Sequence, residues 1–216
     1  MSQHRSVRIS VITFLTLFLL AGKAFPQDKS GMKNTYASSE VIETADKEHR
    51  YLKGIEFLTG FGLAKLQAPQ GSYHVMPLFV DFDFDLKPLL LKKYMRFPGL
   101  LQFVLEPFIA YVYDPNNNIE VGNNFLFKIG FLPETAKFQP YLKGGVGFLY
   151  MSQHTREQGS QFNFNQYAGL GLHYFFKKNL AFTIEYRFRH ISNADIEKPN
   201  KGINTNFTTC GITYLY

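Results

Sequence analysis

Apolar and polar side chains alternate with a period of two along most of the chain, from Lys53 to the end. The alternating segments are long, and each is bounded by clusters of Gly, Pro, Asn, Asp or Lys. Because successive side chains of a strand point to opposite faces, this pattern predicts long antiparallel β-strands. We expect eight strands, at residues 53–66, 72–86, 100–113, 119–132, 138–151, 162–175, 179–192 and 204–216.

The two faces of these strands differ strongly in chemistry. In the segment LAFTIEYRFRH, one face is apolar and aromatic from Leu180 to Phe188, whereas the other carries Glu185, Arg187 and Arg189. A soluble sandwich or a lipocalin-like barrel would also alternate. However, these strands exceed the usual length of about 5–6 residues, and a water-excluding core tolerates ionisable groups poorly.

These features favour a membrane protein in which lipid contacts the apolar face and a polar lumen holds the charges. We therefore predict an all-β fold, an eight-stranded antiparallel transmembrane β-barrel of the outer-membrane type. Eight strands leave a lumen only wide enough for side chains. The ending CGITYLY, which alternates up to the aromatic Tyr216, is typical of such barrels.

The first residues have the layout of a secretory signal peptide. Arg5 and Arg8 precede an apolar run from Val11 to Leu20, which is followed by small residues up to Ala24. The alternative is a single membrane-anchoring helix, but the run is too short to span about 30 Å of hydrocarbon comfortably. We expect a signal peptide at residues 1–24, and hence export to the outer membrane.

The remaining chain divides into two parts. Residues 25–50 form a polar leader, with one short helix expected around residues 39–47, and residues 51–216 form the barrel. Removing residues 1–24 takes away three basic residues and no acid, which lowers the formal net charge from +6 to +3, so nucleic acid is not expected as a partner. The single cysteine, Cys210, cannot form an intramolecular disulfide. Neither a metal site nor a cofactor is predicted, and the sequence leaves the oligomeric state open.

One polar stretch, YRFRHISNADIEKPNKGIN, interrupts the apolar pattern near the end of the chain. His190 and Ser192 continue the lipid-facing positions of the seventh strand, at its expected extracellular end. Two residues apart on one face, their Cα atoms lie roughly 6.6 Å from each other, a separation that a hydrogen bond between the side chains can bridge. Serine becomes an effective nucleophile when a base takes its proton. By itself, this spacing usually means only two polar residues at the end of a strand.

The longer motif is more specific. The block His-x-Ser-Asn-Ala, which begins at His190, and the following Pro-Asn-x-Gly, which begins at Pro199, resemble the signature of the PagL-type lipid A 3-O-deacylases. This resemblance implies an eight-stranded outer-membrane barrel whose substrate is the ester-linked acyl chain at the 3-position of lipid A. It also implies that His190 is the general base and Ser192 the nucleophile.

In the PagL-type family a glutamate acts together with the histidine and the serine, and at this position the chain departs from the signature. Two residues after Gly202, where the family has a glutamate, this chain has Asn204. Its parity predicts that Asn204 faces outward beside His190, where an amide oxygen can accept a hydrogen bond from the imidazole and fix its tautomer. An amide supplies no negative charge. Asp195 and Glu197 of the loop are the candidates to supply it instead, whereas Glu185 has the opposite parity and cannot.

Two further amides lie in the same loop. Asn193 and Asn200 could donate hydrogen bonds to the oxyanion that forms when an ester carbonyl is attacked. The alternative for Asn200 is turn chemistry, because Asn and Gly accommodate positive φ.

Three hypotheses about function remain open at this point. The leading one is an outer-membrane serine esterase that removes an ester-linked acyl chain from lipid A, the lipid part of lipopolysaccharide. The second is a noncatalytic barrel that serves adhesion or envelope structure, and the third is an outer-membrane esterase for phospholipid.

Overall fold

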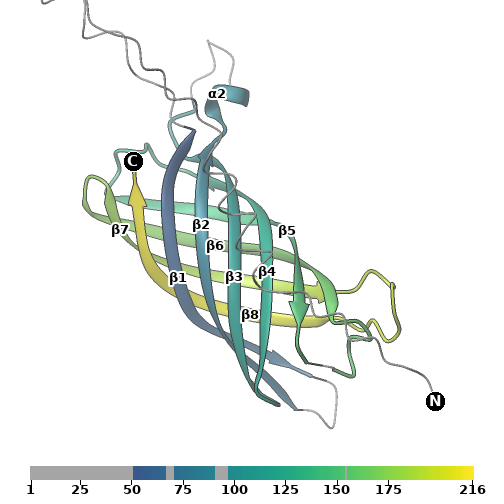
Figure 1. Cartoon of the computed structure of the whole chain (residues 1–216). Coiled ribbons are helices and arrows are strands. Elements are labelled where there is room, and N and C mark those ends of the chain that lie inside the picture. Colours follow the sequence, from purple (N-terminus) through teal and green to yellow (C-terminus); the bar gives the residue numbers. More distant parts are fainter. Residues whose placement is uncertain (1–50, 67–70, 91–96, 154) are drawn as a thin grey trace, which may run out of the picture. The chain divides into compact units, whose positions relative to one another are not determined.

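The computed structural model describes residues 51–66, 71–90, 97–153 and 155–216, which form a closed antiparallel barrel of eight strands (Figure 1). The strands are β1 (Leu52–Lys65), β2 (Ser72–Asp85), β3 (Leu101–Asp114), β4 (Asn118–Gly130), β5 (Phe138–Met151), β6 (Phe162–Lys177), β7 (Leu180–Ser192) and β8 (Ile203–Leu215). A short helix, α2 (Lys87–Leu90), follows β2. The predicted all-β barrel is confirmed, and each strand end lies within two residues of its predicted position.

Two expectations fall outside this part of the chain. The signal peptide expected at residues 1–24 and the leader expected at residues 25–50, with its short helix, lie outside the described residues. Within the described residues, no helix is both long enough and apolar enough to cross a membrane.

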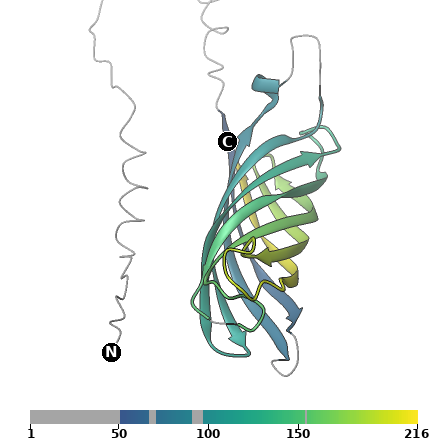
Figure 2. The same ribbon diagram turned by 90° about the vertical axis from the view of Figure 1, so that its right-hand side faces the viewer.

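Each strand pairs with its neighbour in sequence, and β8 closes the sheet by pairing with β1. The closing register runs from Gly54 opposite Leu215 to Ala64 opposite Thr205. The strands wind obliquely around the barrel in both views (Figures 1 and 2). Closure gives both edges of every strand a hydrogen-bonding partner, which matters because hydrocarbon cannot hydrate a free edge.

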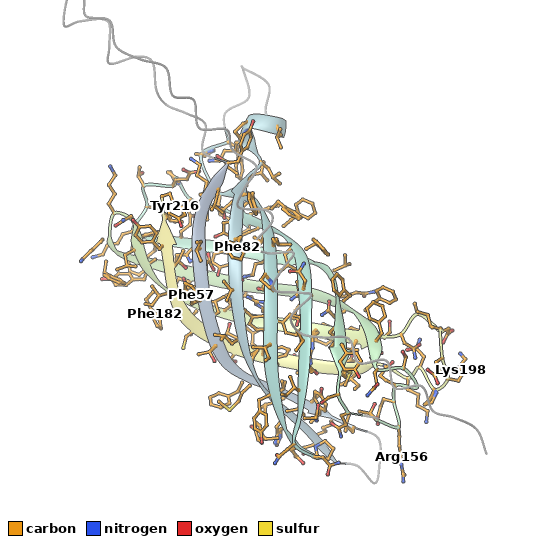
Figure 3. All side chains as sticks on the ribbon, viewed as in Figure 1. Phe57, Phe82, Arg156, Phe182, Lys198 and Tyr216 are labelled. Atoms are coloured by element: carbon orange, nitrogen blue, oxygen red, sulfur yellow. The ribbon has the colours of Figure 1, made fainter. Side chains whose placement is uncertain are left out.

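The outer wall of the barrel is apolar. Phe57 and Phe182 point outward from β1 and β7 (Figure 3), and they are 56% and 43% exposed. In β7 the exposed residues from Phe182 to Phe188 alternate with buried ones that include Glu185 and Arg187, as the sequence pattern predicts. An apolar exterior around a charged interior is the arrangement of a membrane barrel.

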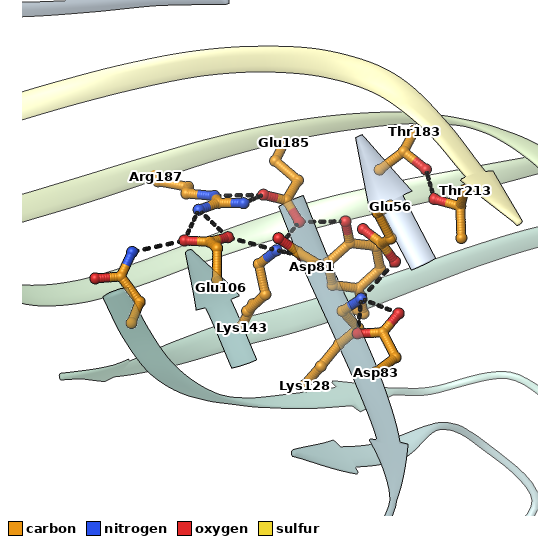
Figure 4. Close-up of polar contacts among 12 residues, drawn as sticks. Glu56, Asp81, Asp83, Glu106, Lys128, Lys143, Thr183, Glu185, Arg187 and Thr213 are labelled. Atoms are coloured by element: carbon orange, nitrogen blue, oxygen red, sulfur yellow. Dashed lines mark hydrogen bonds and ion pairs between the residues drawn. The ribbon is translucent and has the colours of Figure 1, made fainter. Parts of the chain in front are cut away.

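The lumen is filled by paired charges (Figure 4). The Lys128 Nζ donates to Glu56 Oε1 at 2.5 Å and to Asp83 Oδ1 at 2.9 Å, and the Lys143 Nζ donates to Asp81 Oδ2 at 2.6 Å. All five side chains are at most 2% exposed. The lumen at this level is therefore a packed polar core, as expected for eight strands.

A second set of ion pairs continues this core from β7. Arg187 contacts Glu106 at 2.7 Å. Arg189 forms a two-pronged pair with Glu120, in which Nη1 lies 2.6 Å from Oε2 and Nη2 lies 3.2 Å from Oε1. Because these guanidinium groups are on β7, the inner face of the site-bearing strand is anchored to β3 and β4 across the lumen.

Candidate functional site

The site lies where β7 ends and β8 begins, which we call the site end of the barrel. His190 on β7 is directly opposite Asn204 on β8, and His190 Nδ1 lies 2.6 Å from Asn204 Oδ1. Both residues occupy outward-facing positions of their strands. With the amide oxygen as acceptor, Nδ1 carries the proton and Nε2 is left as the acceptor. In this tautomer Nε2 has the free lone pair that the predicted general base would need.

Ser192 occupies the next outward position of β7, opposite Phe164 of β6, and is half-buried. Among the contacts of the described residues, no hydrogen bond joins Ser192 Oγ to His190. In unliganded sites such bonds are often long and tighten when substrate binds. The structure therefore brings the expected nucleophile and base to one face and one strand end, as the alternation predicts.

Gly202 packs directly against the imidazole. Its φ of +75° is one that other residues rarely adopt, and a Cβ built there would lie 2.5 Å from His190 Cε1. The glycine of the Pro-Asn-x-Gly block therefore has a steric role, because any side chain at this position would displace the ring of His190.

The amides of Asn193 and Asn200 shape the loop between β7 and β8. The Asn193 backbone N–H donates to Asn200 Oδ1 at 3.0 Å, and the buried Asn193 side chain donates to the carbonyl of Glu197 at 2.6 Å. Asn200 Nδ2 donates to Asp195 Oδ1 at 3.1 Å. Either amide would have to exchange these loop hydrogen bonds for bonds to substrate in order to stabilise an oxyanion.

In the part of the chain that the structure describes, none of the carboxylates considered as alternative partners of His190 contacts its imidazole. Asp195 is exposed and accepts from Lys198 at 2.7 Å; this hydrogen bond, followed by the one from Asn200, lowers the pKa of Asp195. Glu185 faces the lumen and bonds Tyr141 and the buried cations, consistent with its parity. No contact among the described residues links Asp195, Glu197 or Glu185 to His190, so Asn204 is the partner of Nδ1.

The loop between β5 and β6 braces the β7–β8 loop, which sequence reasoning missed. The Gly159 N–H donates to the carbonyl of Pro199 at 2.7 Å, and Gln158 pairs with Asn200 in an isolated β-bridge. A Cβ at position 159 would lie 2.4 Å from the carbonyl oxygen of Lys198. The sequence did not predict this contact, because pairing between two loops leaves no periodic pattern.

One acidic trio of the described residues has the spacing for a cation. Glu56, Asp81 and Asp83 each place an oxygen within 4.8 Å of the others, inside the lumen. The ammonium group of Lys128 already binds Glu56 and Asp83. This trio therefore belongs to the ion-pair core of the barrel, on the opposite side of the wall from His190.

A family model described as lipid A 3-O-deacylase (PagL) matches residues 91–213, more than half of the chain. The chain belongs to this family. The matched range includes all five expected site residues, so the resemblance drawn from the motif is confirmed at the level of the family. Membership of the PagL family supports an outer-membrane location and lipid A as the lipid acted upon.

Solved structures share the fold at low sequence identity. The crystal structure of the outer membrane enzyme PagL is 18% identical, with a TM-score of 0.54, and the match covers 74% of this chain and 97% of that chain. The crystal structure of Neisserial surface protein A is 14% identical, with a TM-score of 0.53, and covers 75% and 97%, respectively. Comparison with curated protein sequences gives no significant match. Identities this low show the barrel fold alone, so the assignment to the PagL family rests on the family model.

Proposed function

We propose that this member of the PagL family is a serine esterase that removes the 3-O-linked acyl chain of lipid A. The observation that carries the proposal is the imidazole of His190, held at Nδ1 by Asn204 beside Ser192 on the outward face. A histidine with a fixed tautomer next to a serine is the arrangement that activates the serine hydroxyl.

The reaction follows from these atoms. Ser192 Oγ attacks the ester carbonyl while His190 Nε2 takes its proton. The resulting imidazolium then protonates the departing sugar oxygen, which leaves the acyl chain on Ser192. Water, deprotonated by the same nitrogen, attacks the acyl-enzyme and releases the fatty acid with the serine restored. Asn204 keeps Nδ1–H in place throughout both steps.

The outward orientation of the site suits a membrane substrate. An acyl chain in the leaflet that surrounds the site end can reach Ser192 without leaving the hydrocarbon. The exposed apolar side chains nearby, which include Phe164 and Phe188, provide a surface for that chain.

A noncatalytic barrel is the second candidate. The observation that favours it is the amide at position 204, which cannot give the imidazolium a negative partner. The same barrel fold also occurs in Neisserial surface protein A, whose name does not describe an enzyme.

Mass spectrometry of lipid A separates the candidates. Lipid A from cells that express the chain should lack one ester-linked acyl group at the 3-position, whereas lipid A from cells that express Ser192→Ala or His190→Ala should keep it. Heat-modifiable electrophoretic migration and outer-membrane fractionation check that each variant folds. Unchanged lipid A in cells with folded wild-type barrel would favour the noncatalytic alternative. Unchanged lipid A together with newly formed lysophospholipid would favour a phospholipid esterase. Deacylation at the parental rate by Ser192→Ala would exclude the serine mechanism.

A further inference from the structure

A row of polar side chains crosses the outer wall at the level of the site. Gln166 of β6 is opposite His190 of β7, which in turn is opposite Asn204 of β8. Gln166 and Asn204 are exposed and His190 is half-buried, on the face that otherwise presents aromatic and aliphatic groups. His190 and Asn204 therefore belong to a wider polar row.

Lys65 of β1 extends this row. The β1–β8 register ends with Ala64 opposite Thr205, and one further step brings Lys65 level with Asn204. Lys65 has the parity of Leu63, is exposed, and so faces outward on the same side as Asn204. No ion pair joins Lys65 to another residue of the described part of the chain.

Ser72 lies beside this lysine. It is the cross-strand partner of Lys65 on β2, and it also takes an outward position. Directly opposite residues of an antiparallel pair have Cβ atoms about 4.5–5.5 Å apart. The ammonium and the hydroxyl can therefore contact the same group.

Farther around the wall at this end, most outward positions of β3, β4 and β5 carry large exposed apolar groups, such as Tyr111, Ile119, Val121 and Tyr150. One polar pair lies between them and Ser72, in which His74 Nδ1 of β2 is 3.3 Å from Asp114 Oδ2 of β3. At this level, next to the headgroup region, an ammonium and a hydroxyl that face the membrane are best satisfied by a polar group of a lipid. Because Lys65 and Ser72 lie next to Asn204, a lipid bound at the site would supply this polar group.

We propose that Lys65 and Ser72 bind a phosphate group of the glycolipid substrate while its ester carbonyl lies at Ser192. This inference rests on the proposed esterase function. Lysine is a compact charge that binds phosphate as a point cation, and a serine hydroxyl donates a further hydrogen bond to a phosphate oxygen.

The separation fits a group on the same sugar headgroup. Lys65 is two strands away from Ser192, about 9.6 Å across the sheet, and one outward position along it, about 6.6 Å. The two Cα atoms are therefore roughly 12 Å apart, and the long lysine stem covers a large part of that distance. Phosphate recognition would select lipid A over uncharged esters and hold its acyl chain in register with the nucleophile.

The test compares phosphorylated lipid A with enzymatically dephosphorylated lipid A. Initial rates are measured on the full-length barrel in detergent micelles for wild type, Lys65→Gln, Lys65→Arg and Ser72→Ala. Lys178→Gln, which removes an exposed lysine of the β6–β7 turn, is the matched control. Binding of both lipids to Ser192→Ala, with and without Lys65→Gln, is measured by calorimetry, so that the phosphate site is tested without turnover.

We expect Lys65→Gln to raise KM for phosphorylated lipid A about tenfold with little change in kcat, because it removes an interaction made equally in the ground and transition states. Lys65→Arg should retain most of the affinity, and dephosphorylated lipid A should not distinguish Lys65→Gln from wild type. Equal loss on both lipids, or no loss on either, would overturn the proposal. Binding of phosphatidylglycerol to the same variants is measured as well. If Lys65→Gln weakens it as much as it weakens binding of phosphorylated lipid A, the proposal is also overturned, because the site then binds anions in general. If wild type turns over neither lipid but Lys65 still governs phosphate-dependent binding, the esterase function fails and the phosphate site stands.

Discussion

Replacing Asn204 by glutamate tests the central feature of the site, the hydrogen bond between His190 Nδ1 and the amide oxygen at 2.6 Å. During acyl transfer His190 becomes an imidazolium, and the amide offers it a dipole but no charge. A carboxylate in the same outward position would make a charge-assisted hydrogen bond, which is roughly twice as strong as a neutral one. We therefore expect Asn204→Glu to deacylate lipid A faster than wild type.

The size of the effect follows from the surroundings of the pair. Two unit charges 4 Å apart gain about 4 kcal/mol at an effective dielectric constant of 20, whereas fully solvated pairs gain about 0.2–1 kcal/mol. The His190–Asn204 pair lies on the outer face and is open to the headgroup region, so an intermediate gain of roughly 1–2 kcal/mol is reasonable. This corresponds to a rate increase of about 5- to 30-fold.

The assay is release of fatty acid from lipid A by equal amounts of folded barrel, with Asn204→Ala and Asn204→Asp measured alongside. Asn204→Ala should be slower than wild type, because the imidazole loses the partner that fixes its tautomer. If Asn204→Glu is inactive while Asn204→Ala keeps the wild-type rate, Asn204 does not orient His190. Asp195 or Glu197 would then be the better candidate for the third member.

Two further substitutions test the support of the site and of the barrel. Gly202→Ala should reduce the deacylation rate by about tenfold or more, because its Cβ would lie 2.5 Å from His190 Cε1 and would displace the ring. The positive φ of +75° adds a cost of about 1–2 kcal/mol of stability. A wild-type rate in this variant would contradict the packing of the imidazole on the loop. Lys128→Met should lower the free energy of unfolding by about 3–5 kcal/mol, because it leaves Glu56 and a second buried carboxylate without their cation. Denaturant unfolding in lipid vesicles measures this loss, for which Lys178→Met is the exposed control, and equal midpoints for the two variants would refute the structural role of the lumen pairs.

The sequence by itself determined the fold class and the orientation of the central site residues. Alternation with a period of two is a local property of a strand, so it assigned His190 and Ser192 to the outer face and Glu185 to the lumen. Counting back from the chain end gave Asn204 the same outward parity. The hairpin between the two strands then predicted its contact with His190, and the structure contains this hydrogen bond.

Contacts between distant strands were decided only by the tertiary structure. Lys128 meets Glu56 across the lumen, 72 positions apart in sequence, and the level of Lys65 relative to Asn204 depends on how β1 and β8 close the barrel. Alternation fixes which face a side chain takes, but not which residue of another strand stands opposite, because that depends on the register and tilt of the closed sheet. For the same reason the brace from Gly159 to Pro199 had no signature in the sequence, since two loops meet only after the strands that carry them are in place.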